Sequence, residues 1–138
     1  MAGENLTEKV SVNVNSSTLS EIDLLVDNGY YSNRSDFINQ ALRESLREQQ
    51  MTISRIVAKQ QKAAKHAENN WFLGVFGVTN SMLKDMQQTG EQSPINGYGV
   101  LILGDELDRE MLYASVTEIT VRGRVIAPKD IKEHYGIK

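Results

Sequence analysis

A stretch of seven residues near the N-terminus, residues 9–15, constrains the fold more than any other part of the chain. Valine alternates there with polar residues, in the order Lys9, Val10, Ser11, Val12, Asn13, Val14, Asn15. Alternate side chains of a β-strand point to opposite faces, so the stretch predicts a strand with one apolar face and one hydrogen-bonding face. An isolated strand leaves its backbone donors and acceptors unpaired, and this one therefore requires a partner strand.

A second copy of the same strand would meet that requirement. Two such strands, antiparallel about the two-fold axis of a homodimer, would bury the valines and present Lys9, Ser11 and Asn13 of each chain outward. A two-stranded ribbon fits the major groove of DNA, where asparagine can pair with adenine, lysine with guanine acceptors, and serine with either base. The alternative for these seven residues alone is a solvated edge strand with ordinary polar side chains.

Composition excludes several classes of protein. The chain has no cysteine, which rules out disulfides, thiolate zinc sites and cysteine nucleophiles. No apolar run approaches the length of a membrane span, and the N-terminus lacks the pattern of a signal peptide, so we expect a cytoplasmic protein. The net charge is −3, and only residues 51–70 are net basic. Any affinity for DNA must therefore come from a few placed contacts, and not from a broad basic field.

Two helices are predicted directly after the strand. Ser16 to Thr18 offer N-cap hydroxyls, with Glu21 placed as in a capping box, and Asn28-Gly29 ends a helix of about ten residues. A second cap cluster at residues 32–36 opens a longer helix with an apolar stripe. One such strand-helix-helix unit has too little core, whereas a dimer that interlocks four helices under the ribbon has enough.

The pattern over residues 8–48 resembles the ribbon-helix-helix DNA-binding domains of the Arc, MetJ and CopG type. Its most recognisable part is the start of the second helix, which reads Gly29-x-x-Ser32-x-x-Ser35-x-Phe37-Ile38. The resemblance implies an intertwined dimer with a two-stranded antiparallel ribbon. It covers about a third of the chain and leaves the C-terminal part unassigned.

The resemblance also implies which residues contact DNA. Lys9, Ser11 and Asn13 match the positions that contact bases. A second group matches the phosphate-binding N-terminus of the second helix, and it consists of Ser32, Asn33, Arg34 and Ser35. Free backbone N–H groups and the helix dipole favour an anion there. Simple capping is the alternative for Ser32 and Asn33, and both roles can coexist. For Arg34 the alternative is a surface ion pair with Glu8 or Asp36.

The second helix is predicted to be long, because no glycine or proline occurs between Gly29 and Gly74. We expect it to run from Asn33 to about Asn69, with a break near residues 50–52, and to pair with its dimer mate or with the tail. Four of its basic residues fall at spacings of four, three and four and so share one face, namely Arg55, Lys59, Lys62 and His66. A solvated basic face is the favoured interpretation, and an additional contact with phosphate or an acidic partner is the alternative.

The remainder predicts a small α+β domain for oligomerisation or sensing. The expected division is a DNA-binding domain at 1–50, a helical linker at 51–70 and this domain at 71–138. Three segments, at Gly77, Gly99 and Gly123, share a plan of glycine, apolar run, capping residue and short helix. Residues 116–121 alternate as a strand should, and residues 87–97 read as a polar loop. Asp105 and Pro128 are the expected helix openers.

Catalysis and metal binding find little support in the sequence. The two histidines lie on different predicted elements with no cysteine nearby, so we expect no transition-metal site, no cofactor and no enzymatic activity. An acidic patch is formed by Asp105, Glu106, Asp108 and Glu110. Its favoured role is to cap a helix and complement its dipole, and a hard-cation site is the less favoured alternative.

These observations predict a homodimeric, sequence-specific DNA-binding transcriptional regulator, either a repressor or an autoregulator. Its partner is double-stranded DNA, on which dimers could pair into tetramers at tandem sites, and the C-terminal domain could bind a protein partner. The alternative is an antitoxin whose C-terminal part neutralises a toxin, although antitoxin tails are typically disordered until bound. A third class is a structural assembly protein whose tail polymerises.

Overall fold

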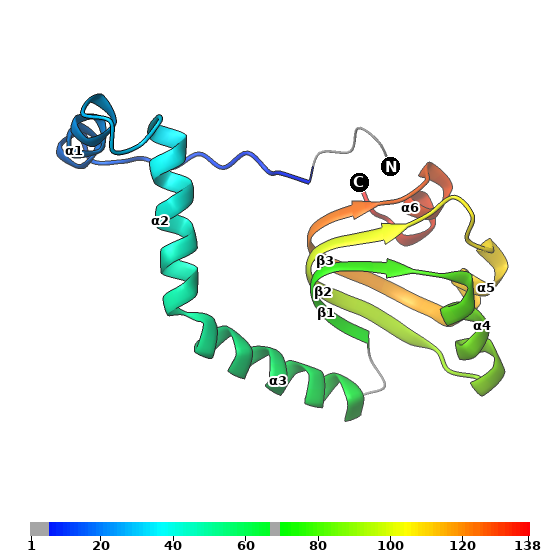
Figure 1. Cartoon of the computed structure of the whole chain (residues 1–138). Coiled ribbons are helices and arrows are strands. Elements are labelled where there is room, and N and C mark those ends of the chain that lie inside the picture. The colour runs from blue at the N-terminus through cyan, green and yellow to red at the C-terminus, as the bar shows by residue number, and fades with distance from the viewer. Residues whose placement is uncertain (1–5, 67–69) are drawn as a thin grey trace. The chain divides into compact units, whose positions relative to one another are not determined.

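The computed structural model describes residues 6–66 and 70–138, which form two compact units, one up to Arg55 and the other from Ile56 onward. Three helices come first (Figure 1): α1 (Ser16–Asp27), α2 (Arg34–Glu48) and α3 (Gln50–His66). Strands and helices then alternate: β1 (Asn70–Val78), α4 (Asn80–Thr89), β2 (Ser93–Leu103), α5 (Arg109–Ser115), β3 (Val116–Ile126) and α6 (Lys129–Tyr135).

Helix α1 begins earlier than the capping pattern predicted. Its N-cap is Asn15, whose side-chain oxygen accepts a hydrogen bond from the backbone N–H of Ser17 at 2.9 Å. The capping box at Thr18 and Glu21 is therefore wrong, because an asparagine three residues upstream already caps the first turn of the helix. The predicted end is confirmed: Asn28 is the C-cap, and Gly29 follows with φ of 83°.

The predicted long helix is interrupted where a break was expected. Helix α2 ends at Glu48, Gln49 is its C-cap, and α3 begins at Gln50. The backbone N–H of Gln49 donates to the carbonyl of Leu46, the short bond that tightens a final turn. The expected end of the helix near Asn69 lies outside the described residues.

Residues 6–15 form neither helix nor strand in the single chain (Figure 1). The side chains of Val10 and Val12 are 78% and 73% exposed. A strand is defined by hydrogen bonds to a neighbouring strand, and none of the three described strands forms a ladder with this segment. The paired ribbon thus remains a prediction about two chains.

The C-terminal unit has a three-stranded parallel sheet in the order β1-β2-β3. Each strand is followed by a helix, and α4 and α5 return the chain to the end of the sheet at which the next strand begins, which is the connection that parallel strands require. The unit is therefore α/β, and the predicted α+β class is wrong. The three similar segments of the sequence correspond to the three strand-helix turns.

Two local predictions within this unit are also wrong. The polar loop at 87–97 is short, because α4 continues to Thr89 and β2 begins at the buried Ser93. Asp105 does not open a helix: Asp108 caps α5 by accepting from the N–H of Met111, while Asp105 pairs with Arg109.

The strand predicted at 116–121 is confirmed and extends to Ile126, and Pro128 does open α6.

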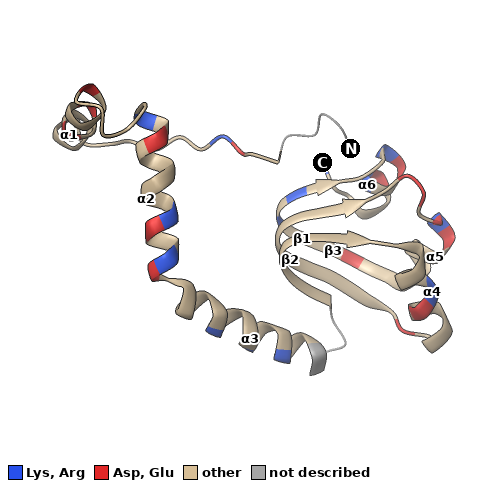
Figure 2. Ribbon diagram, in the orientation of Figure 1, with Lys and Arg blue, Asp and Glu red and all other residues tan. Residues whose placement is uncertain are grey.

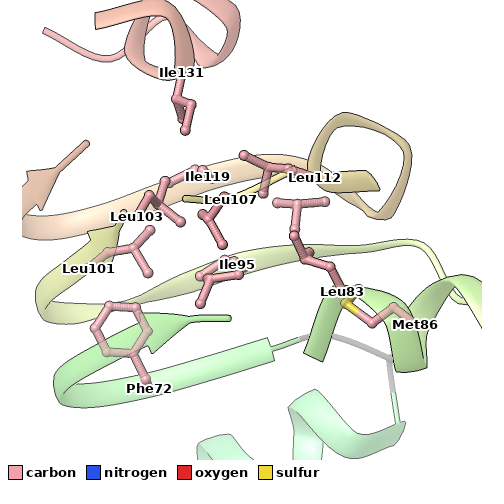
Figure 3. Packing of buried hydrophobic residues seen from close by; sticks show 12 residues of the cluster. Phe72, Leu83, Met86, Ile95, Leu101, Leu103, Leu107, Leu112, Ile119 and Ile131 are labelled. Atoms are coloured by element: carbon pink, nitrogen blue, oxygen red, sulfur yellow. The ribbon is translucent and has the colours of Figure 1, made fainter. Parts of the chain in front are cut away.

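The core of this unit lies between the sheet and its helices (Figure 3). Helices α4, α5 and α6 all contribute side chains to the same cluster as the strands, so they cover one face of the sheet. The buried hydrophobic residues are Phe72, Val78, Leu83, Met86, Ile95, Leu101, Leu103, Leu107, Leu112, Val116, Ile119 and Ile131. Burial of these side chains supplies most of the stability of the unit.

Side-chain hydrogen bonds fasten each strand-helix turn to the next. The amide of Asn80 donates to the carbonyl of Glu106 at 2.9 Å and accepts from the N–H of Asp108 at 2.8 Å. The guanidinium of Arg109 donates to Asp130 at 2.7 Å. The hydroxyl of Tyr135 donates to the carbonyl of Val116 at 2.8 Å. These bonds join turns that lie more than fifteen residues apart in sequence.

A row of glycines crosses the sheet. Gly74 pairs with Gly99, and Gly99 pairs with Gly123. All three have positive φ, at 111°, 131° and 141°. A Cβ on Gly99 would lie 1.9 Å from the carbonyl oxygen of Gly74, so only glycine fits this row. Figure 1 shows the three strands curving together, and the glycine row is where their backbones leave the ordinary β conformation.

Replacement of Gly99 by alanine should lower the free energy of unfolding of the C-terminal unit by at least about 2 kcal/mol, because the new Cβ meets the Gly74 carbonyl and the φ is strained. The single tryptophan, Trp71 in β1, reports this unfolding by fluorescence in urea. Gly77→Ala on β1 is the matched control, since a Cβ there meets nothing within 4 Å. Equal destabilisation by both variants would show that the glycine row is not a steric requirement.

Candidate nucleic-acid interface

The residues predicted to contact bases are solvent-exposed in the single chain. Lys9, Ser11 and Asn13 all lie in the segment of residues 6–15 that precedes α1. Their arrangement on one face depends on the paired ribbon, so the structure of one chain leaves that prediction open.

The N-terminal unit has almost no core of its own. Among its described residues, Ile22 is the sole buried hydrophobic side chain, and α2 buries none. Large apolar side chains that would ordinarily be inside are exposed, namely Val10, Val12, Val14, Leu24, Ile38, Leu42 and Leu46. Patches of this kind mark an interface with another molecule.

The N-terminus of α2 is organised by reciprocal capping. The side chain of Asn33 accepts from the N–H of Asp36 at 2.8 Å, and the Asp36 carboxylate accepts from the N–H of Ser32 at 3.0 Å. The capping role predicted as the alternative for Asn33 is thus present. Among the described residues, no group accepts from the first two backbone N–H groups of the helix, those of Arg34 and Ser35. Those two amides can bind an anion.

Arg34 forms an ion pair with Asp23 of α1. Its Nε and one terminal nitrogen donate to the two carboxylate oxygens, both at 2.8 Å, in a bidentate arrangement. The pair joins α1 to α2 across the turn. An ion pair was predicted as the alternative role of Arg34, but its partner is neither Glu8 nor Asp36. Because the two residues are eleven apart and on different helices, no helical spacing could have indicated the pairing.

These contacts shift carboxyl pKa values in the N-terminal unit. The hydrogen bond from Arg34, together with its positive charge, lowers the pKa of Asp23 below 3.8. The backbone N–H of Ser32 and then the amide of Gln40 lower the pKa of Asp36. Both carboxylates are therefore ionised at neutral pH, and Asp36 places a negative charge beside the free amides of α2. A phosphate at that site would have to be held against this charge.

Three basic residues of α3 are exposed. Arg55, Lys59 and Lys62 lie at spacings of four and three on the helix, so they share one face, and Figure 2 shows basic positions along α3. The side chain of His66 lies outside the description. Among the described residues, no hydrogen bond or ion pair engages these three cations, so they are available to a partner.

Two other kinds of site find no support in the described residues. No group of three or more histidine, cysteine or acidic side chains is placed to hold a metal ion there. None of the described helices is long and apolar enough to cross a membrane. The acidic patch of α5 is engaged in local bonds, with Asp108 capping the helix and Asp105 bound to Arg109.

Asp23→Asn should destabilise the N-terminal unit at neutral pH, and the loss should vanish at low pH. The folded-state pKa of Asp23 is depressed, so its contribution is present above 3.8 and is lost as the pH falls through the lower folded value. Both partners are exposed, and the effect should be modest. Urea unfolding followed by helical circular dichroism, at one protein concentration and a series of pH values, measures it.

Asp27→Asn is the matched control, because it removes the same charge from the same helix without breaking the ion pair. It should not destabilise the unit. A deficit for Asp23→Asn that persists unchanged well below pH 3.8 would contradict the ionic origin of the effect.

Comparison with known families identifies the chain. The profile of the Ribbon-Helix-Helix transcriptional regulator family matches residues 5–132. The match extends through both units, and so reaches well beyond the residues 8–48 that carry the resemblance in the sequence. No curated protein and no solved structure gives a significant match. Because the family profile covers most of the sequence, the chain belongs to the Ribbon-Helix-Helix transcriptional regulator family.

Proposed function

We propose that the protein is a homodimeric, sequence-specific DNA-binding transcriptional regulator, a repressor or an autoregulator, that acts in the cytoplasm. Residues 9–14 of two chains pair as an antiparallel ribbon, and the ribbon enters the major groove. The observation that carries the proposal is the uncovered apolar surface of the N-terminal unit, on a chain whose family is one of transcriptional regulators.

The exposed apolar residues support the dimer. A unit that buries only Ile22 among its described hydrophobic residues cannot offset the conformational entropy of ordering its two helices. A second copy would supply the missing contacts, since Val10, Val12 and Val14 could pack over Ile38, Leu42 and Leu46. Pairing of the two strands would also satisfy the backbone groups of residues 9–14.

The polar positions between the valines support the reading of bases. In the paired ribbon, Lys9, Ser11 and Asn13 of both chains face outward, and their side chains match the donor and acceptor pattern of the major groove. Because the chain is acidic overall, binding relies on a few placed contacts. The free amides of Arg34 and Ser35 are the phosphate anchor at the N-terminus of α2, with Ser32 and Asn33 beside them.

The rest of the chain has a separate role in the proposal. Arg55, Lys59 and Lys62 on α3 are a second, weaker phosphate contact or a contact for an acidic partner. The C-terminal unit joins chains or senses an effector. Its packed core supports a regulator over an antitoxin, since an antitoxin tail would be expected to lack a core before it meets its toxin.

Val12→Asp should prevent the ribbon from forming, because pairing would bury two carboxylates against each other at the two-fold axis. Hydrogen exchange of the backbone amides of residues 9–14 measures ribbon formation directly. We expect these amides to be protected from exchange in the native protein and unprotected in the variant. Asn13→Asp is the matched control, since it adds the same charge on the outward face and should keep the protection. Protected amides in Val12→Asp would contradict the paired ribbon.

Asn13→Ala should relax base preference and cost about 1–3 kcal/mol for each Asn13 that pairs with a base. The native protein first selects its sites from a random pool of duplexes, and the affinities of both proteins for the selected site and for an unrelated duplex are then measured at one salt concentration. Affinity for the unrelated duplex should barely change. Equal weakening on both duplexes would mean that Asn13 does not read bases.

A further inference from the structure

The two edges of the C-terminal sheet differ in charge. Strand β3, at one edge, carries Glu118, Arg122 and Arg124. Strand β1, at the other edge, has no charged residue and no proline between Asn70 and Val78. Charged residues are what natural proteins place on edge strands to prevent pairing with another chain. The β1 edge lacks this protection.

Strand β1 is also exposed at its centre. Leu73 and Val75 are 53% and 64% exposed, and Gly74 between them is exposed as well. Trp71 and Tyr98 lie beside Leu73 on the face of the sheet away from α4, with their ring centroids 6.4 Å apart. An uncharged, apolar edge of this length is a template for a further strand.

The glycine row continues to the open β1 edge. A Cβ on Gly123 would collide with the carbonyl of Gly99, and a Cβ on Gly99 with that of Gly74, so each glycine lets the next strand toward β1 approach closely. Nothing lies within 4 Å of a Cβ built on Gly74, so this position leaves room for the backbone of an added strand. Strand β1 of a second copy places the same positive-φ glycine opposite Gly74 when the two strands run antiparallel about a two-fold axis at that residue. The bends of the two sheets then coincide, and both sets of helices lie on the same side.

That register also pairs side chains of matching size. Each Leu73 comes to lie opposite Val75 of the second copy, so two exposed apolar side chains cover each other on each side of the axis. Each Trp71 comes opposite Gly77, a large side chain beside a position with none, and a Cβ at Gly77 meets nothing within 4 Å in the single chain. Phe72 comes opposite Phe76 on the inner face, where the two already stack within one chain.

We propose that the β1 edge pairs with β1 of a second copy of this chain, antiparallel about a two-fold axis at Gly74, so that two C-terminal units share one continuous sheet. This interface is isologous and closes on itself, unlike a head-to-tail contact between β3 and β1, which would extend into a filament. The contact does not depend on DNA binding. If the ribbon also pairs, it holds chains at a high local concentration and strengthens the second contact.

Cysteine cross-linking of the full-length chain tests the register, because the native chain has no cysteine. Leu73→Cys and Val75→Cys variants are mixed, allowed to exchange and oxidised. Opposite residues in an antiparallel pair have Cα atoms about 4.5–5.5 Å apart, which a disulfide can span. We expect a covalent dimer containing one chain of each variant. Each variant alone should give little, because equivalent positions are diagonal neighbours, about 7–8 Å apart.

A mixture of Leu73→Cys with Arg122→Cys is the control for head-to-tail pairing, in which Gly123 would align with Gly74 and Arg122 with Leu73. A covalent dimer as abundant in this mixture as in the first would overturn the proposal in favour of a filament. The absence of a mixed dimer between Leu73→Cys and Val75→Cys would also overturn it, and would leave the edge to a strand of another protein. Native fluorescence of Trp71 verifies that each variant is folded.

Charge pairs give a second test that is independent of the ribbon. Two double variants are made in the Val12→Asp background. In the first, Leu73→Lys and Val75→Lys in one chain place a lysine across from a lysine of the second copy on each side of the axis. In the second, Leu73→Lys and Val75→Glu place a lysine across from a glutamate at the same two positions. Sedimentation should show association of the second variant stronger by about tenfold than that of the first. Equal association would overturn the register, whereas loss of the ribbon alone would leave this difference intact.

Discussion

The N-terminal unit cannot cover its own apolar surface, and the rest of its architecture depends on that constraint. Helices α1 and α2 bury one large hydrophobic side chain between them in the single chain, that of Ile22. The preceding valines are exposed, and their backbone has no described partner. Local forces nevertheless fix the two helices, through the caps at Asn15 and Asn33 and the ion pair between Arg34 and Asp23. The helices are thus preformed beside an apolar surface that the described residues of their own unit leave uncovered.

The C-terminal unit, in contrast, covers its apolar surface within one chain. Each strand-helix turn presents one apolar face, and stacking three turns encloses a continuous core. Hydrogen bonds from Asn80 and Arg109 hold successive turns in register. Stacked repeats leave an open side at each end, and terminal repeats ordinarily carry a polar outer face. The last turn meets that need with charged residues on β3, and the first turn does not.

Most elements with local signals were predicted from the sequence, apart from the cap at Asn15, whereas those set by distant contacts were missed. Asn28-Gly29 and the polar residues near Gln49 stop a helix through their own backbone preferences, so both ends were predicted correctly. Asp105 and Asp108 are equally suited to cap a helix, and the choice between them depends on Arg109, which binds Asp105. The parallel sheet and its glycine row depend on strand register, to which residues more than twenty apart contribute.

In the candidate site too, local contacts were predicted from the sequence and a contact between two helices was missed. Capping by Asn33 follows from the residues around it, and it was foreseen as an alternative to phosphate contact. The pairing of Arg34 with Asp23 was not, because it crosses from one helix to another. The family profile reaches residue 132, so it includes a C-terminal unit that no local motif had identified.

The Arg34–Asp23 pair also bears on the proposed contact with a DNA phosphate. If Arg34 is to contact DNA, its guanidinium must first break the bidentate ion pair with Asp23, whose bonds are 2.8 Å long. The net free energy gained from Arg34 is then the difference between an ion pair with phosphate and the ion pair with Asp23. The backbone amides of Arg34 and Ser35 lose nothing comparable, because no described group accepts from them. Their position is fixed by the Asn33 cap and does not depend on where the Arg34 side chain lies. We therefore expect the helix amides, more than the guanidinium, to anchor the phosphate, with Asp23 keeping Arg34 as the link between α1 and α2.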